Sequence, residues 1–129
     1  MHWTLETQKT LALEWSMAFT DEELQAIRAA LDPLCERVPL HVRDQVRMAY
    51  DVDRLGVILF EERPDWRGGS EWMRHPIAKF RYYRRRDEWE LYWQRADLKW
   101  HLYEPGGPAR RLATLVRHVD RDQYGCFFG

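Results

Sequence analysis

The stretch of sequence that decides the fold runs from Ile77 to Tyr103 and reads IAKFRYYRRRDEWELYWQRADLKWHLY. Apolar and polar side chains alternate along it in three runs, at residues 78–83, 89–94 and 98–103, with turn-forming residues between them. Alternation with a period of two is typical of strands that bury one face. Three such runs in succession predict an antiparallel meander.

Side chains that lie opposite each other on neighbouring strands point to the same face, and this rule fixes the register of the predicted meander. Across the turn at residues 84–87, it places Tyr82 opposite Trp89 and Phe80 opposite Leu91. The first two strands of the meander are therefore expected to bury these rings and the leucine together.

The register across the second turn depends on the number of residues in the loop. We expect a loop with an even number of residues, because it pairs Trp93 with Trp100 and keeps the apolar residues on one face. A loop of three residues would set Trp93 beside Lys99 instead. With the even loop, Trp89, Trp93 and Trp100 are predicted to be buried on one face of the sheet.

Two further strands are predicted ahead of the meander. Residues 46–52 alternate between apolar and polar side chains, and residues 55–60 follow after a short turn, which is typical of a hairpin. Residues 57–60 are apolar without a break. An unbroken apolar run predicts a central strand that is covered on both faces.

The segment between the hairpin and the meander, residues 62–75, contains Pro, Gly and Ser and is predicted to be the main irregular loop. It also contains Trp66 and Trp72. Because tryptophan is highly buried on average, both rings are expected to fold back over the sheet as a lid.

The first helix is expected to begin after Thr20, because Thr20 and Glu23 have the spacing of a capping box. Its apolar stripe continues at helical spacing, and Pro33 is expected to kink the helix or restart it at Asp32. A second helix with one apolar stripe is expected at residues 109–119. The chain then closes with three aromatic residues and a cysteine, which are expected to dock on the domain.

These elements together predict an α+β fold. It consists of a five-stranded antiparallel sheet, made of a hairpin and a three-strand meander, packed with an N-terminal kinked helix and a C-terminal helix. Residues 17–129 are expected to form this single domain. Residues 1–16 are expected to be an N-terminal extension of uncertain structure.

Composition narrows the class of protein. The chain has 129 residues, of which 45% are apolar and 14% aromatic, so it can bury a core and is not of the disordered class. It lacks the run of about 20 apolar residues that a membrane-spanning helix needs. Its first residues do not resemble a signal peptide, so we expect a cytoplasmic protein in which Cys35 and Cys126 are reduced thiols.

Charge is distributed unevenly along the chain, although the formal net charge is only −1. Residues 1–62 contain 6 basic and 12 acidic side chains, whereas residues 63–121 contain 14 basic and 8 acidic ones. The two halves either pair with each other in one fold or leave a basic surface that attracts a polyanion.

Several short motifs occur in order along the chain: CERVP at residues 35–39, LFEERPDW at 59–66, PIAKF at 76–80, LYW at 91–93, LKWHLY at 98–103 and CFFG at 126–129. In this combination the chain resembles the bacterial domain-of-unknown-function family 3024 (DUF3024), over roughly residues 18–129. The resemblance implies a cytoplasmic bacterial protein and carries no established activity or catalytic residues.

The sequence predicts no catalytic residue, metal ligand or cofactor, because the histidines lack ligand spacing and no nucleophile or phosphate-loop motif is present. One enzymatic alternative remains, a Mg²⁺-dependent nuclease. Asp97 and Lys99 have the spacing that such enzymes use, and Asp51, Glu61 and Glu62 are candidate further ligands. Asp97 also lies in a predicted turn, where aspartate is an ordinary turn residue.

The second face of the meander mixes cations with aromatic rings, as in sheets whose rings stack on bases and whose cations hold phosphates. The predicted nucleic-acid-binding residues are Lys79, Arg81, Tyr83, Arg84, Arg85, Arg86, Tyr92, Lys99 and His101. Tyr103 is expected on the same face, and Arg81 is expected to pair with Glu90, which neutralises part of the charge.

Three interpretations of this face remain open at this point. The leading functional hypothesis is a non-catalytic binding protein whose ligand is single-stranded nucleic acid. A solvated or helix-covered face without a ligand is the second interpretation. The third is a protein-interaction module, which would form a homodimer through an edge strand or through the aromatic tail.

Overall fold

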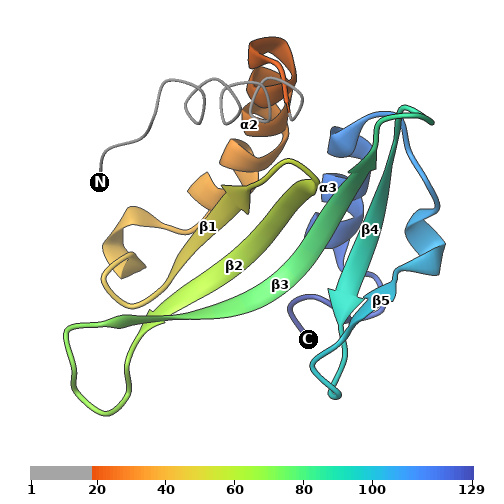
Figure 1. Ribbon diagram of the computed structural model, residues 1–129. Coiled ribbons are helices and arrows are strands. Elements are labelled where there is room, and N and C mark those ends of the chain that lie inside the picture. The colour runs from red at the N-terminus through yellow and green to blue at the C-terminus, as the bar shows by residue number, and fades with distance from the viewer. Residues whose placement is uncertain (1–18) are drawn as a thin grey trace, which may run out of the picture.

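Five antiparallel strands lie side by side in the order in which they occur in the chain (Figure 1). The structure is a computed structural model that describes residues 19–129. The strands are β1 (Arg47–Val52), β2 (Gly56–Pro64), β3 (Trp72–Tyr83), β4 (Glu88–Gln94) and β5 (Trp100–Leu102). The helices are α2 (Asp21–Glu36) and α3 (Leu112–Arg121), with short 3-10 turns at Leu40–Val42 and Glu104–Gly106. The predicted α+β fold is confirmed.

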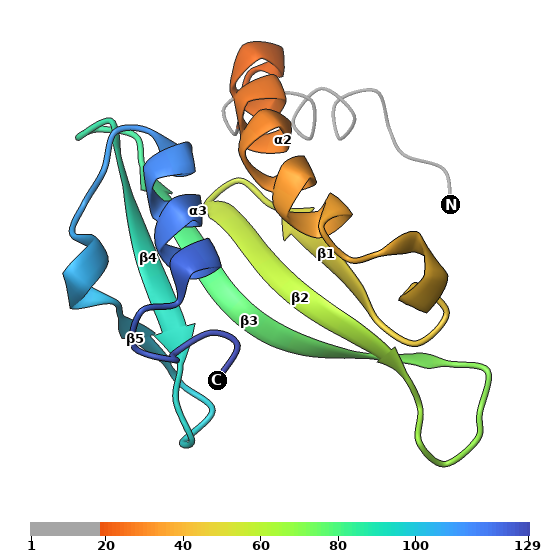
Figure 2. The same ribbon diagram turned by 180° about the vertical axis from the view of Figure 1, so that it is seen from behind.

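Both α-helices cover the same face of the sheet (Figure 2). We call this face the inner face and the opposite one the outer face. Leu59, Ala78, Phe80 and Leu91 on the strands are completely buried against the helices. The core is therefore a single layer of side chains between the sheet and α2 and α3, and the outer face is free of helices within the described residues.

The capping box at the start of α2 is confirmed. The Glu23 backbone N–H donates to the Thr20 hydroxyl at 3.1 Å, and the Glu23 carboxylate accepts from the Thr20 N–H at 2.9 Å. The expected restart of the helix at Asp32 is wrong, because one helix continues through Pro33 to Glu36, and the alternative, a kink at Pro33, stays a prediction. Leu31 and Leu34 are buried on either side of Pro33, and this packing offsets the hydrogen bond that proline removes.

The predicted register across the first turn of the meander is confirmed. Tyr82 lies opposite Trp89, and Phe80 lies opposite Leu91. Trp89 is only 7% exposed, and its ring stacks on that of Phe19, with 5.7 Å between the centroids and 6° between the planes. The start of α2 is thereby tied to the meander.

The predicted register across the second turn is wrong. Residues 95–99 form a five-residue loop, so that Trp93 lies opposite His101 and Trp100 lies opposite Gln94. Leu98 in this loop has a positive φ of 62°. Glycine is the usual residue in this conformation, and the loop contains none, so nothing in the sequence indicated it.

The odd loop exchanges the two faces of β5 relative to the prediction. Trp100 points to the outer face, whereas His101 and Tyr103 point to the inner face, where Tyr103 is only 2% exposed. Of the three tryptophans expected in the core, Trp89 is buried, Trp93 is half-buried against the core, and Trp100 is half-buried on the other face.

The expected lid is wrong as well. β2 and β3 remain paired as far as Pro64 opposite Trp72, and only residues 65–71 form a loop. Trp66 at the tip is 85% exposed, and Trp72 packs under the guanidinium of Arg47, 3.5 Å from its ring centroid. The strand propensity of the flanking residues therefore outweighed the turn residues between them.

The hairpin of β2 and β3 extends past the end of β1, which pairs with β2 only up to Glu62. We call residues 63–73, which are paired only with each other, the arm; Figure 1 shows it projecting from the sheet. β2 is an interior strand as expected, but its outer-face residues Ile58 and Phe60 are half-buried rather than covered.

The C-terminal helix carries the predicted apolar stripe, and its four members Leu112, Leu115, Val116 and Val119 are buried. The tail docks beyond this helix. The Asp122 carboxylate accepts hydrogen bonds from the N–H groups of Phe127 and Phe128, at 2.9 and 2.8 Å, and the Phe127 ring lies 5.0 Å from that of Tyr103. None of the described helices is long and apolar enough to cross a bilayer. The extension at residues 1–16 lies outside the described residues.

Candidate nucleic-acid interface

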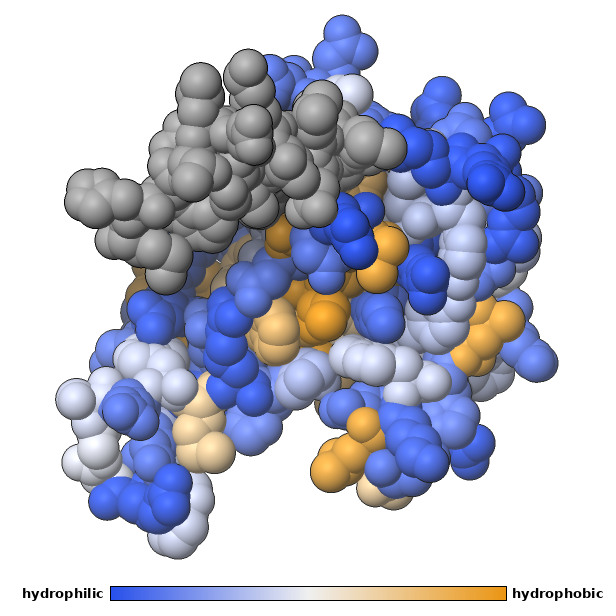
Figure 3. Space-filling view, viewed as in Figure 1, coloured by the Kyte–Doolittle hydropathy of each residue, from blue (hydrophilic) through white to orange (hydrophobic). Residues whose placement is uncertain are grey.

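Six of the nine predicted nucleic-acid-binding residues gather at one end of the outer face, whereas Arg84 turns toward the inner side, where its guanidinium lies over the rings of Phe19 and Tyr82. Lys79, Arg81 and Tyr83 occupy alternate positions of β3, and Tyr92 of β4 lies directly opposite Lys79. The turn from β3 to β4 contributes Arg85 and Arg86, the last two of three consecutive arginines. Figure 3 shows hydrophilic side chains concentrated around this turn. We call these six residues the basic aromatic face.

The two tyrosines of this face are joined through their hydroxyl groups. The hydroxyl oxygens of Tyr83 and Tyr92 lie 2.8 Å apart, and the Tyr92 hydroxyl donates to the Glu90 carboxylate, also at 2.8 Å. Burial, followed by these two hydrogen bonds, raises the pKa of Tyr92 well above its ordinary value. Both rings are therefore held in fixed orientations with neutral hydroxyls.

Cations lie over both rings. The guanidinium carbons of Arg81 and Arg86 are 5.0 and 4.2 Å from the centroid of the Tyr83 ring. The Lys79 ammonium is 5.9 Å from the centroid of the Tyr92 ring. Such contacts stabilise by about 0.5–1 kcal/mol when exposed, so a ligand could displace these side chains at small cost.

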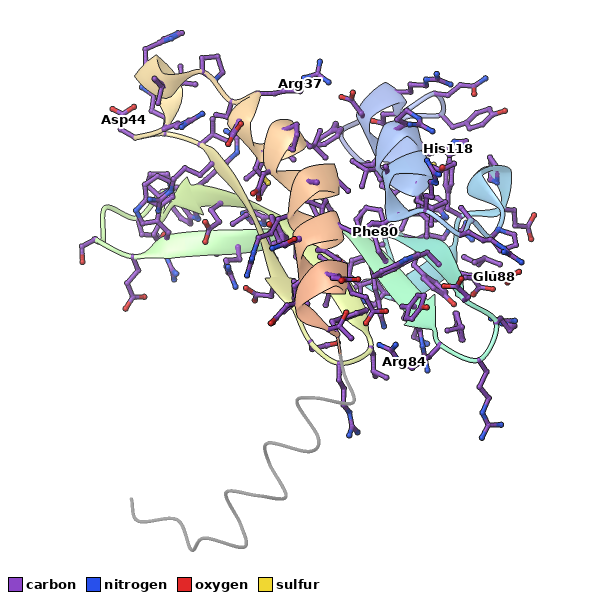
Figure 4. The ribbon with its side chains drawn as sticks, turned by 90° about the horizontal axis from the view of Figure 1, so that it is seen from above. Arg37, Asp44, Phe80, Arg84, Glu88 and His118 are labelled. Atoms are coloured by element: carbon purple, nitrogen blue, oxygen red, sulfur yellow. The ribbon has the colours of Figure 1, made fainter. Side chains whose placement is uncertain are left out.

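Some of the predicted cationic residues form ion pairs with glutamates. Arg86 lies 3.4 Å from Glu90 and 3.9 Å from Glu88, and Arg84 reaches to Glu23 at the start of α2, at 3.2 Å (Figure 4). The Arg84 contact also helps to lower the pKa of Glu23, together with the capping hydrogen bonds and against the effect of burial.

Other cations of the face lack a carboxylate partner. Arg81 lies opposite Glu90 as predicted, but the two form no ion pair, because Glu90 is engaged by Tyr92 and Arg86. Within residues 19–129, Lys79, Arg81 and Arg85 have no carboxylate within ion-pair distance. The Nε of Arg81 is moreover buried without a hydrogen-bond acceptor.

Lys99 and His101 do not lie on this face, so their predicted placement beside the other seven residues is wrong. His101 points to the inner face, with its Nε2 2.9 Å from the Asp97 carboxylate, and Lys99 lies in the loop before β5. Tyr103 is in the core. The five-residue loop places Trp100 and Leu102 on the outer face instead, where Leu102 lies opposite Tyr92. The exchange of the two faces of β5 follows from the length of the loop alone, and the loop contains no glycine that would have indicated its conformation.

Asp97 behaves as a turn residue. It accepts a hydrogen bond from the Lys99 backbone N–H at 2.9 Å, and this bond, followed by that with His101, lowers the pKa of its carboxyl. The other candidate ligands form ion pairs, since Arg74 binds both Asp51 and Glu62, at 2.8 and 3.0 Å, and Arg63 binds Glu61. In the described part of the chain, no group of three or more His, Cys, Asp or Glu side chains is placed to hold a metal ion. The geometry therefore does not favour the nuclease hypothesis.

Neither cysteine is an activated nucleophile. Both are free thiols. Burial, reinforced by Asp32 and Glu36, raises the pKa of Cys35 to about 11, and burial also raises that of Cys126. Since the thiolate is the reactive form, both side chains are expected to be inert near neutral pH.

Comparison with known proteins identifies a family and nothing closer. No curated protein and no solved structure matches the chain. A family model described as "Domain of unknown function (DUF3024)" matches residues 19–129, which is nearly the whole chain and all of the described structure. The protein therefore belongs to the DUF3024 family.

Proposed function

We propose that the protein is a non-catalytic binding protein that takes up single-stranded nucleic acid on the basic aromatic face. The observation that carries the proposal is the combination of Lys79, Arg81 and Arg85, which have no carboxylate partner within residues 19–129, with Tyr83 and Tyr92 on one sheet surface. Following the family resemblance, we place this function in the bacterial cytoplasm.

Each group has a distinct part in the proposed complex. Cations that now lie over the tyrosine rings move to the phosphates, and the exposed rings stack on bases. The buried Nε of Arg81 gains the acceptor that it lacks. Backbone charge and ring stacking do not distinguish between bases, so binding is expected to be largely independent of sequence.

The proposal predicts a salt-dependent affinity for a labelled single-stranded oligonucleotide, measured by fluorescence anisotropy across a series of NaCl concentrations. Each phosphate contact contributes about 0.7 to the slope of log affinity against log salt. Arg81→Ala is therefore expected to weaken binding and to reduce this slope by about that amount. Tyr92→Leu is expected to lose about 1–3 kcal/mol of stacking with an unchanged slope.

The matched control is Arg117→Ala, which removes the same charge from an exposed position on α3, a helix of the inner face. It is expected to leave the affinity and the slope unchanged. Equal effects of Arg81→Ala and Arg117→Ala would contradict the proposal, because they would indicate general attraction to charge rather than a site. Binding that does not respond to salt would contradict it as well.

A further inference from the structure

Trp66 is the most exposed large apolar residue of the described chain, with 85% of its surface open to solvent. It lies at the tip of the arm, the two-stranded ribbon that no third strand joins. Exposed tryptophans are costly to solvate, and they are enriched among the residues that contribute most to binding at protein interfaces. The position of Trp66 therefore indicates a protein contact.

The loop that presents Trp66 is held in one conformation by local hydrogen bonds. The Asp65 N–H donates to the Glu71 carbonyl at 3.0 Å and closes the loop. The Asp65 carboxylate accepts from the Arg67 N–H at 3.0 Å and binds the Arg67 guanidinium through two bonds of 3.1 Å. A preformed loop loses little entropy on binding, which favours Trp66 as an anchor.

The same chain contains an apolar groove on the side of the sheet that the helices cover. It lies between α2 and α3, next to the β3–β4 turn, and has a volume of about 470 Å³. Ala26, Ala29, Ala30 and Ala113 line it, and these small side chains leave room between the helices, which Figure 2 shows side by side. We call this the α2–α3 groove. It is large enough to accept an indole ring.

The charges that lack a partner are of opposite sign on the groove and on the loop of Trp66. Arg110 and Arg111 line the groove, and neither has a carboxylate partner in the described part of the chain. Glu23 and Asp87 also line the groove, but Glu23 pairs with Arg84, and Asp87 accepts a hydrogen bond from the Tyr82 hydroxyl. Glu71, in the same loop as Trp66, is exposed, and among residues 19–129 it has no cationic partner. An arm that docks at the groove therefore brings a free carboxylate to a surface with two free guanidinium groups.

The arm cannot reach the groove of its own chain. β3 begins at Trp72, within the arm, and Tyr82 near its other end lines the groove. Ten residues of strand separate these two positions, which is roughly 33 Å. The arm and the groove therefore lie at opposite ends of the sheet, and any contact between them has to join two molecules (Figure 1).

We propose that Trp66 of one copy of this chain inserts into the α2–α3 groove of a second copy. The contact is head-to-tail, so each copy offers one arm and one groove, and repetition gives a closed ring or an open chain. It uses none of the six residues of the basic aromatic face. Self-association and nucleic-acid binding can therefore each fail without the other.

Sedimentation velocity of the full chain over a range of concentrations tests the proposal. The wild type is expected to form oligomers whose share rises with concentration. Trp66→Ala is expected to be monomeric because it removes the anchor, and Ala26→Phe because its ring fills the groove from an exposed position. Leu98→Ala is the matched control, since it removes an apolar side chain that is 76% exposed elsewhere, and it is expected to assemble like the wild type.

The decisive measurement is made on a mixture of the two monomeric variants. The Trp66→Ala chain retains its groove and the Ala26→Phe chain retains its arm, so the mixture is expected to form dimers and nothing larger. Circular dichroism establishes that each variant is folded. A wild type that stays monomeric at several hundred micromolar would overturn the proposal, and so would assembly of Trp66→Ala or a mixture without dimers.

Discussion

Arg81 occupies an unusual position for a single charged residue. Its Cα pairs with Gly56 on one neighbouring strand and with Glu90 on the other, yet its guanidinium lies over Tyr83 and its Nε has no acceptor. A buried donor without an acceptor costs about 1–3 kcal/mol. Replacing Arg81 therefore removes a ligand contact while costing the fold little, which makes it the best single probe of the proposed site.

The Cys35 thiol is expected to make the stability of the fold depend on pH. Its pKa is raised from about 9 to about 11 in the folded chain, chiefly by burial, so the thiolate forms first in unfolded molecules. The contribution of Cys35 to stability is therefore complete below pH 9 and is lost as the pH rises toward 11. In a Cys126→Ser variant, the rate of alkylation by iodoacetamide is expected to have its midpoint near pH 11.

The unfolded chain provides the control for this measurement. In denaturant, the midpoint for Cys35 is expected to return to about 9, its ordinary value. A midpoint near 9 in the native protein would contradict the burial of this thiol beside Asp32 and Glu36.

At the scale of elements, the close approach of β2 and β3 is most sensitive at Gly56. A Cβ atom at this position would lie 1.9 Å from the carbonyl oxygen of Phe80, which belongs to the backbone and cannot move aside. Gly56→Ala is therefore expected to lower the free energy of unfolding by at least about 1–3 kcal/mol. Urea denaturation measures the change.

Gly69→Ala is the matched control for Gly56. A Cβ atom there would meet nothing closer than 3.9 Å, so a change within about 0.5 kcal/mol is expected. Equal stability of the two variants would mean that β2 and β3 are not as close at Gly56 as described.

The turns of the meander explain how much of the fold the sequence could predict. The β3–β4 turn was predictable because the alternation of Tyr82 and Trp89 leaves one register that buries both rings. The β4–β5 turn was not, because Trp100 and His101 are both amphipathic and either can point inward. The arm was missed since Pro64, Gly68 and Gly69 suggested a loop longer than the seven residues observed.

The candidate site was predictable to the same extent as its strands. Lys79, Arg81, Tyr83 and Tyr92 lie in β3 and β4, whose register is confirmed, and they meet on one face. Lys99 and His101 lie beyond the mispredicted loop and were lost from the face. The ion pairs that occupy Arg84 and Arg86 depend on the distances between side chains, which alternation along a strand does not contain.

The whole molecule combines one core with a division of charge between its two halves. Acidic residues of the first half meet basic residues of the second, as in the pairs of Asp51 with Arg74 and of Glu23 with Arg84. These pairs are largely exposed and contribute at most about 1 kcal/mol each. Stability therefore rests on the side chains between the sheet and the helices, where residues of α2, α3 and β2–β4 form a single cluster.

A single cluster predicts a single unfolding transition for the full chain. Helix content, followed by far-UV circular dichroism, and tryptophan emission are expected to change at the same urea concentration. At a protein concentration at which the chain is monomeric, Trp66→Phe is expected to reduce the emission signal without moving the midpoint, because Trp66 is exposed. Separate midpoints for the two signals would contradict a shared core.

Five residues lie between Gln94 and Trp100, and this number decides to which face of the sheet each side chain of β5 points. Deleting or inserting one residue there turns the strand over, which would send Trp100 inward and expel Tyr103 from the core. A change of two residues keeps each side chain of β5 on its present face and alters only the length of the loop. Natural length variation at this point of the family should therefore come in pairs of residues.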